Sequence, residues 1–184
     1  MELTLPVGTV RPFLAADAPS LARHADDRRV WLNLRDRFPH PYGLGDAETF
    51  IAAAGRQSPP TVFAIVVDGA AVGGIGFERH ADVERVSAEL GYWLGAAYWN
   101  RGIATAAVGA VTRHAFRQHA DLERLYALPF AWNAASARVL EKAGYRLEGR
   151  LRRAAIKDGR VTDQLLYAIL RDEVETGPPP PRRA

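Results

Sequence analysis

The chain has 184 residues, of which 48% are apolar and 24% charged, and its formal net charge is +3. These values are typical of one globular domain with room for a substantial core. The absence of cysteine excludes disulfides, thiolate metal ligands and cysteine nucleophiles, and because the five histidines show no metal-ligand spacing we expect no metal.

The same composition restricts location and partners. A pI near 9.5 suits an anionic ligand, but the basic residues form no stripe of the kind that binds nucleic acid, so no nucleic-acid partner is expected. No segment has the length of a membrane span and the first residues lack a signal-peptide pattern, so we expect a cytoplasmic protein that binds no membrane. A homodimer stays open.

The predicted elements of the first 60 residues are a strand, helices and a break. They comprise a strand over residues 3–13, one or two helices after a cap at Asp17, a proline-rich break over residues 37–43 and a helix from Asp46 to about residue 54.

The remaining elements alternate between strand and helix. In chain order they are a hairpin of residues 61–67 and 71–77, a strand over 86–94, a helix over 101–118, a strand over 122–128, a helix over 134–143 ending at Gly144, and a hairpin of residues 145–156 and 161–170. This order predicts an α/β fold with a mixed sheet that helices cover on both faces. The domain is expected to span residues 1–172, followed by a disordered, proline-rich tail over 173–184.

The segment of residues 99–106, WNRGIATA, is the most informative turn of the chain. It follows an apolar strand and opens an Ala/Val-rich helix with small residues, which leaves the first N–H groups of the helix accessible. These groups and the positive end of the helix dipole form a site for phosphate. The alternative is a helix start packed tightly on a sheet. The turn is neither a dinucleotide fingerprint nor a Walker loop.

A second motif, NAASARVLEKAGY over residues 133–145, narrows the interpretation. Together the two motifs resemble the GNAT N-acetyltransferase superfamily, and within it the RimJ/RimL-like group. The segments ELGYWL, YWNRGIATAA, NAASARVLEKAGY, LEGRLR and KDGRVTDQLLYAIL stand in the order of that group, and the resemblance covers residues 3–170. It implies a single-domain acyl-CoA N-acyltransferase fold, with a mixed, mostly antiparallel sheet of about seven strands flanked by helices.

The resemblance implies acetyl transfer from acetyl-CoA to an amine, and it assigns residues to the cofactor. Pyrophosphate would lie on Asn100, Arg101, Gly102, Ile103, Ala104 and Thr105; pantetheine would lie along Tyr92, Trp93 and Leu94; and Asn133 would bind the cofactor arm. Trp99 replaces the first residue of the family's turn pattern, and the RimJ/RimL-like group often carries Trp there.

Two residues are candidates for catalysis. Glu89 is the expected base, acting through water, and it shares a strand face with Gly91 and Trp93; the alternative is an ion-paired or solvent-facing carboxylate. Ser136 matches the serine that is the general acid in the RimL-like pattern, and the alternative is a hydrogen bond to the cofactor or to the helix start.

Two departures from the family restrict the mechanism. Leu140 stands where many acetyltransferases have a tyrosine acid. Ala155 stands where the RimL-like pattern has a glutamate base, so the ribosomal-protein substrate of that group is not carried over.

The resemblance places the acceptor beside residues 33–42. The candidate substrate-binding residues of this segment are Asn33, Arg35, Arg37, Phe38, His40 and Tyr42. The arginines suit a substrate carboxylate, Asp36 or His40 would equally suit an amine, and the aromatic residues would alternatively only fill the core.

The expected acceptor is a protein N-terminal α-amine or a small-molecule amine. A weak base favours an α-amine with a pKa near ~8 over a lysine near ~10.4. The competing hypothesis is a catalytically silent module that binds acyl-CoA.

Overall fold

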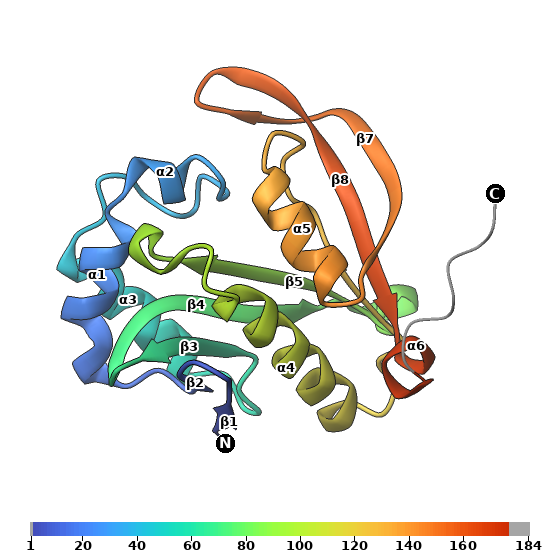
Figure 1. Ribbon diagram of the computed structural model, residues 1–184, viewed down its shortest axis with the longest axis horizontal. Coiled ribbons are helices and arrows are strands. Elements are labelled where there is room, and N and C mark those ends of the chain that lie inside the picture. The colour runs from blue at the N-terminus through green and yellow to red at the C-terminus, as the bar shows by residue number, and fades with distance from the viewer. Residues whose placement is uncertain (1, 177–184) are drawn as a thin grey trace.

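A twisted sheet runs through the molecule, and helices cover both of its faces (Figure 1). The computed structural model describes residues 2–176. The strands are β1 (Leu3–Thr4), β2 (Thr9–Arg11), β3 (Val62–Val67), β4 (Ala70–Arg79), β5 (Ser87–Leu94), β6 (Arg124–Ala127), β7 (Arg146–Lys157) and β8 (Arg160–Leu170). Within residues 2–176 they form one eight-stranded sheet in the order β1-β2-β3-β4-β5-β6-β8-β7. Only the β5–β6 pair is parallel, so the predicted mixed, mostly antiparallel sheet is confirmed.

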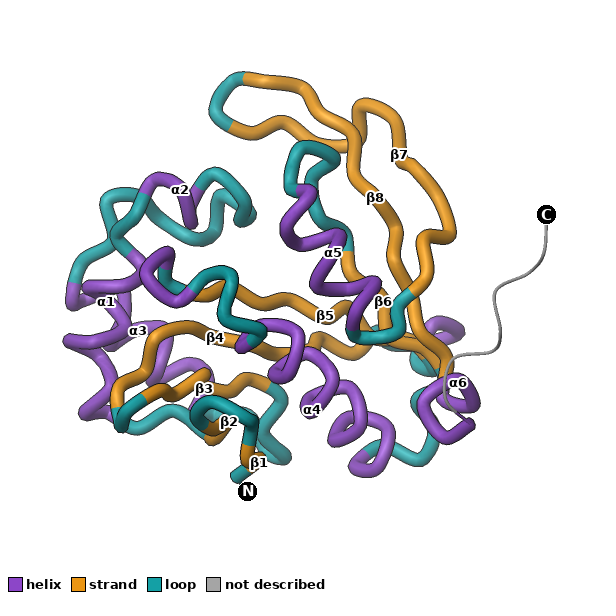
Figure 2. The backbone as a smooth tube through the Cα atoms, viewed as in Figure 1, coloured by secondary structure: helices purple, strands orange, loops and turns teal. Residues whose placement is uncertain are grey.

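The helices divide between the two faces. They are α1 (Ala18–Ala25), α2 (Arg28–Trp31), α3 (Leu44–Gly55), α4 (Ile103–Gln118), α5 (Ala134–Lys142) and α6 (Arg171–Thr176), with short 3₁₀ turns at Ala15–Asp17, Asp82–Glu84 and Ala96–Tyr98. One core cluster joins α1 and α3 to the sheet and another joins α4 and α5 to its opposite face. The tube view shows these two pairs of helices on different sides of β4 and β5 (Figure 2). The prediction of a sheet covered on both faces is therefore confirmed.

The first predicted strand is two strands instead of one. The segment predicted as a continuous strand over residues 3–13 turns back at Gly8, whose φ is +89°. A Cβ at this position would lie 2.1 Å from the carbonyl oxygen of Val66, so only glycine fits. This turn accounts for eight strands where about seven were expected.

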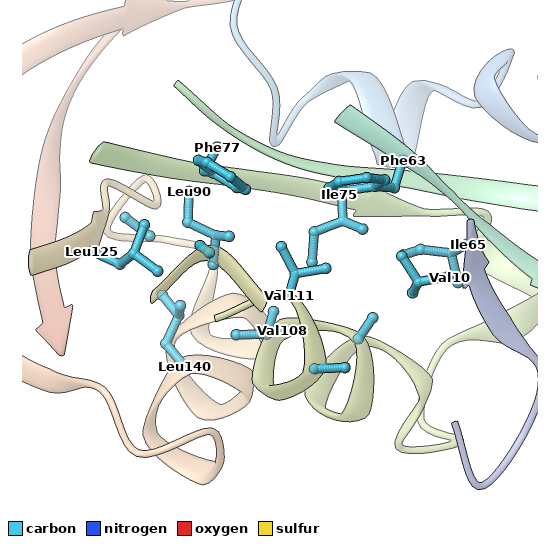
Figure 3. Close-up of a cluster of buried hydrophobic side chains, with 14 of the residues drawn as sticks. Val10, Phe63, Ile65, Ile75, Phe77, Leu90, Val108, Val111, Leu125 and Leu140 are labelled. Carbon is cyan, nitrogen blue, oxygen red and sulfur yellow. The ribbon is translucent and has the colours of Figure 1, made fainter. Parts of the chain in front are cut away.

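Apolar side chains between the sheet and α4 form the larger core (Figure 3). Phe63, Ile75 and Leu90 project from the sheet toward Val108 and Val111 of α4, and all five are almost fully buried. Burial of each such side chain away from water contributes about 2 kcal/mol to the free energy that stabilises the folded state. This packing fixes α4, and therefore its first turn, against β5.

The parallel β5–β6 pair is short, and this creates an opening in the sheet. Its register runs from Ser87 opposite Arg124 to Glu89 opposite Tyr126, after which the two strands diverge. The second half of β5 keeps its pairing to β4, so within residues 2–176 the backbone of residues 91–94 has a strand neighbour on one side only. Its other edge retains unpaired N–H and C=O groups.

The C-terminal boundary differs slightly from the prediction. α6 spans Arg171–Thr176, so residues 173–176 of the predicted tail are helical. Residues 177–184 of the predicted tail lie outside the described residues. None of the helices within residues 2–176 is long and apolar enough to cross a membrane.

Candidate active site

The turn before α4 presents the start of a helix to open space. Asn100 and Gly102 have positive φ values of +61° and +75°, and Gly102 is the N-cap of α4. A Cβ added at Gly102 would meet nothing within 4 Å. The N–H groups of residues 103–105 have no acceptor within an α-helix. The turn therefore has room and donors for an anionic group.

Aromatic contacts hold this turn in place. The indole Nε1 of Trp99 donates to the carbonyl oxygen of Leu94, 2.7 Å away, which ties the turn to the end of β5. The guanidinium of Arg101 lies 5.4 Å from the ring centroid of Tyr98, and that of Arg29 lies 5.8 Å from the ring of Trp99. Trp99 thus has a structural role that explains a tryptophan at this position.

A hydroxyl group of β5 and a hydroxyl group of α5 contact each other beside the opening in the sheet. The Tyr92 hydroxyl lies 2.7 Å from Ser136 Oγ, and Asn133 Oδ1 accepts a hydrogen bond of 3.0 Å from the backbone N–H of Ser136. Asn133 therefore caps α5 while Ser136 keeps its hydroxyl directed at Tyr92. Burial raises the pKa of Tyr92 to about 12, so its phenol stays protonated.

Glu89 lies on the other face of β5, at the point where the strands diverge. Its carboxylate accepts a hydrogen bond from the guanidinium of Arg35, so the ion-paired alternative is correct as a description of its contacts. Side chains alternate along a strand, so Glu89 and Tyr92 project to opposite faces. The open edge of β5 lies between the carboxylate on one face and the Tyr92–Ser136 pair on the other.

The side chains of the other two predicted cofactor residues of β5 pack against neighbouring elements. The side chain of Leu94 is buried in the core. The ring of Trp93 packs against Phe38, with ring centroids 5.4 Å apart, and lies beside Gly74. Ile103 is also buried, whereas Ala104 and Thr105 are half-exposed at the start of α4.

Two residues of the predicted acceptor segment, Arg35 and Asn33, lie beside the opening. Arg35 reaches Glu89, and Asn33 Oδ1 accepts a 3.2 Å hydrogen bond from the indole of Trp132, next to Asn133. These contacts place the segment beside β5 and beside the loop that precedes α5, and its role in binding an acceptor stays a prediction.

The other four predicted residues of the segment make different contacts. Phe38 and Tyr42 pack together with ring centroids 4.7 Å apart, and Tyr42 is buried, so the core-filling alternative describes their contacts. Arg37 is exposed beside Glu78 at 3.6 Å. His40 stacks on Trp31 with ring centroids 5.5 Å apart.

A buried lysine on the β7–β8 hairpin is a site feature that sequence reasoning missed. Lys157 is only 1% exposed; its Nζ lies 2.7 Å from Asp36 Oδ1 and 3.7 Å from the ring centroid of Trp31. Next to it, Arg28 donates to Asp158 at 2.6 Å. The sequence KDGR indicates only a hairpin turn, so no sequence signal points to this contact.

A cavity of about 280 Å³ lies where the hairpin meets the acceptor segment. It is lined by Arg35, Asp36, Phe130, Ala155, Ile156, Lys157 and Gln164. Arg35 also contacts Glu89, so the cavity adjoins the candidate base. In residues 2–176 no cluster of His, Asp and Glu has the composition of a metal site.

Comparison with known proteins identifies similar sequences and structures. Residues 9–146 match the family described as the acetyltransferase (GNAT) domain. The chain is 34% identical to the uncharacterized N-acetyltransferase YoaA of Bacillus subtilis, over 54% of this chain and 55% of YoaA. It is 31% identical to the ribosomal-protein-serine acetyltransferase of Escherichia coli, over 60% of this chain and 61% of that protein. These matches span less than two thirds of either relative.

A solved structure extends the similarity to almost the whole chain. RimJ of Mycobacterium smegmatis, in complex with CoA-disulfide, superimposes with a TM-score of 0.80 at 27% sequence identity. The superposition covers 94% of this chain and 87% of that chain.

Proposed function

The chain belongs to the acetyltransferase (GNAT) family, in its RimJ/RimL-like group, and from this premise we propose that it transfers the acetyl group of acetyl-CoA directly to an amine. The observation that supports this most strongly is the open edge of β5 at residues 91–94, between Glu89 on one face and Ser136 on the other. An acyl donor extended along that edge would present its carbonyl between a base and an acid.

The residues around the edge fit coenzyme A. The space in front of Gly102 and the free N–H groups of the first turn of α4 suit a pyrophosphate. Along residues 91–94, the backbone groups that face away from β4, apart from the Leu94 carbonyl bound by Trp99, suit the amide groups of pantetheine, which would bind as an added strand does. Asn133 uses its oxygen to cap α5, so its amide nitrogen is the group that would donate to the cofactor arm.

The chemistry requires one proton to leave and one to arrive. As the C–N bond forms and the C–S bond breaks, Glu89 takes a proton from the amine through water. Ser136 Oγ gives its proton to the departing sulfur while the Tyr92 hydroxyl, 2.7 Å away, passes its own proton to Ser136, and water reprotonates Tyr92 once coenzyme A has left. Because the pKa of Tyr92 is raised to about 12, the phenol is protonated at neutral pH before each turnover and takes its proton back afterwards.

The acceptor enters from the face of Glu89, where the 280 Å³ cavity has both charged and apolar walls. We infer a protein N-terminal α-amine or a small-molecule amine, since a lysine near pKa ~10.4 would need a stronger base than a water-mediated carboxylate. Ala155 lines this cavity where the RimL-like pattern has a glutamate, so the acceptor of those relatives is not assigned to this chain. A cytoplasmic location and a homodimer remain predictions.

The test is thiol release from acetyl-CoA in the presence of peptide N-termini, amino acids, polyamines and aminoglycosides. We expect one class to accelerate release, and Glu89→Gln and Ser136→Ala to lower the turnover number about 100-fold at saturating acetyl-CoA. Binding of acetyl-CoA with no acceleration by any amine would favour the silent module. Failure to bind acetyl-CoA would refute both functions.

A further inference from the structure

A tyrosine and a histidine lie directly behind Glu89. Tyr126 in β6 is the register partner of Glu89, in the last pair before the strands diverge. Paired residues of neighbouring strands project to the same face, so the Tyr126 ring lies on the face of Glu89. Its hydroxyl is 2.7 Å from His80 Nε2, and the two rings stack with centroids 5.7 Å apart and an interplanar angle of 9°.

Burial and the charges of nearby groups both act on the Tyr126 phenol. Burial raises the pKa of Tyr126, and the charges of Glu89 and Glu84 raise it further, whereas Arg35 and Arg124 act in the opposite direction. The guanidinium of Arg124 lies 5.1 Å from the ring centroid. Tyr126 is therefore a neutral phenol that is hydrogen-bonded to an imidazole and neighbours Glu89 across the strand register.

His80 connects this phenol to solvent. Its side chain is 34% exposed, and its Nδ1 lies 4.0 Å from a carboxylate oxygen of Glu84, whose own side chain is 73% exposed. An imidazole accepts a proton at one ring nitrogen and releases one from the other. The His80–Tyr126 pair thus has one end beside Glu89 and the other in water.

We propose that Tyr126 and His80 form a relay that carries to solvent the proton which Glu89 removes from the acceptor amine. This proposal rests on the proposed function and deepens it. Protonated Glu89 gives its proton to the Tyr126 oxygen as the Tyr126 O–H proton passes to Nε2 of neutral His80. The imidazolium then loses its Nδ1 proton to water, and exchange with solvent restores the starting tautomer. Glu89 becomes a carboxylate again, ready for the next acceptor.

Two conservative variants test the relay in the intact protein. Tyr126→Phe keeps the ring stack and removes the hydroxyl; His80→Gln keeps an acceptor for that hydroxyl and cannot take up a proton. Each should lower kcat about tenfold and leave both KM values within twofold. The double variant should be no slower than the slower single variant, because the pair acts as one unit. His114→Gln, a half-buried histidine remote from Glu89, should retain the wild-type kcat within twofold.

A titration without substrates separates this proposal from the proposed function. The pKa of Tyr126 can be followed by NMR of ¹³C-labelled tyrosine. It should fall in Glu89→Gln, which removes a negative charge, and stay constant in the control Glu48→Gln, since Glu48 is an exposed residue of α3. An unchanged pKa in Glu89→Gln would overturn the relay whatever the activity. So would wild-type kcat in either folded relay variant, or multiplying effects in the double variant. A fall in the pKa with no acetyl transfer by the wild type would instead refute the proposed function.

Discussion

The guanidinium of Arg35 donates a hydrogen bond to the carboxylate of Glu89, and this ion pair joins residues 54 positions apart. Arg35 lies on the segment that was expected to contact the acceptor, and Glu89 lies where β5 and β6 diverge. The contact therefore couples the acceptor side of the site to the candidate base. Glu89 is ion-paired and also placed for catalysis, so the two alternatives for this residue are compatible.

Replacing Arg35 by methionine should lower kcat about tenfold, because Glu89 loses the contact that fixes its carboxylate. The matched control is Arg37→Met. Arg37 and Glu78 are 3.6 Å apart with both side chains about three-quarters exposed, and such pairs contribute at most about 1 kcal/mol. Steady-state kinetics should show Arg37→Met within twofold of wild type. Equal losses in both variants would mean that the charge of the segment matters and the position of Glu89 does not.

Gly102→Glu should raise the Kd for coenzyme A by about 100-fold, because a carboxylate would face the pyrophosphate at the start of α4. Gly159→Glu is the matched control: Gly159 has a φ of +72° against +75° at Gly102, and a Cβ meets nothing within 4 Å at either position. Backbone strain is therefore similar in both variants. Calorimetric titration should show unchanged affinity in Gly159→Glu, and a normal Kd in folded Gly102→Glu would mean that pyrophosphate binds elsewhere.

The ion pair of Asp36 and Lys157 should respond asymmetrically to substitution. Asp36→Asn leaves a buried ammonium without its counter-charge and should lower the free energy of unfolding by about 2 kcal/mol. Lys157→Met leaves Asp36, which is 71% exposed, in water, so its cost should be about 1 kcal/mol or less. Urea denaturation measures both. A larger loss in Lys157→Met would contradict the burial of the ammonium.

Replacing Tyr42 by phenylalanine should change the stability at high pH and leave catalysis unchanged. Burial, with a contribution from Asp46, raises its pKa to about 12 from about 10 in the unfolded chain. The stability that this provides is present below pH 10 and is lost as the pH rises to 12. Between pH 8 and pH 11, Tyr42→Phe should therefore lose about 1 kcal/mol less stability than wild type. Urea denaturation at both values checks this.

The same variant distinguishes a core residue from a substrate contact. At pH 8 its kcat/KM should equal the wild-type value within twofold, because Tyr42 is buried against Phe38. A tenfold loss would return Tyr42 to the acceptor site.

Local features of this site were predictable from sequence. The turn at Gly102 was recognisable because its glycine, the small residues of the first helical turn and the preceding strand are contiguous. The cap of α5 by Asn133 is equally local, since capping involves residues three positions apart, but the family resemblance assigned Asn133 only to the cofactor arm. Alternation along β5 correctly grouped Glu89 with Trp93 on one face, and the ring contact of Trp93 with Phe38 now shows what that face packs against.

Contacts between distant elements were not predictable. Nothing in the sequence near Lys157 indicates that its ammonium is buried against Trp31, because the hairpin and α2 meet only in the folded chain. The pairing of Glu89 with Tyr126 depends on where the parallel register ends. The break of the first strand at Gly8 was missed because the close approach of Val66 is a tertiary constraint.

The contacts of the β7–β8 hairpin with α2 and with Asp36 also have a consequence for how the chain folds. Lys157 and Asp36 are 121 residues apart, and Arg28 and Asp158 are 130 apart. Contacts of such long sequence separation form slowly, because the intervening chain must be ordered before they are gained. During synthesis, the wall of the cavity that residues 28–36 form with the β7–β8 hairpin would therefore be completed only after the hairpin has been made. By then the N-terminal half has already had time to fold.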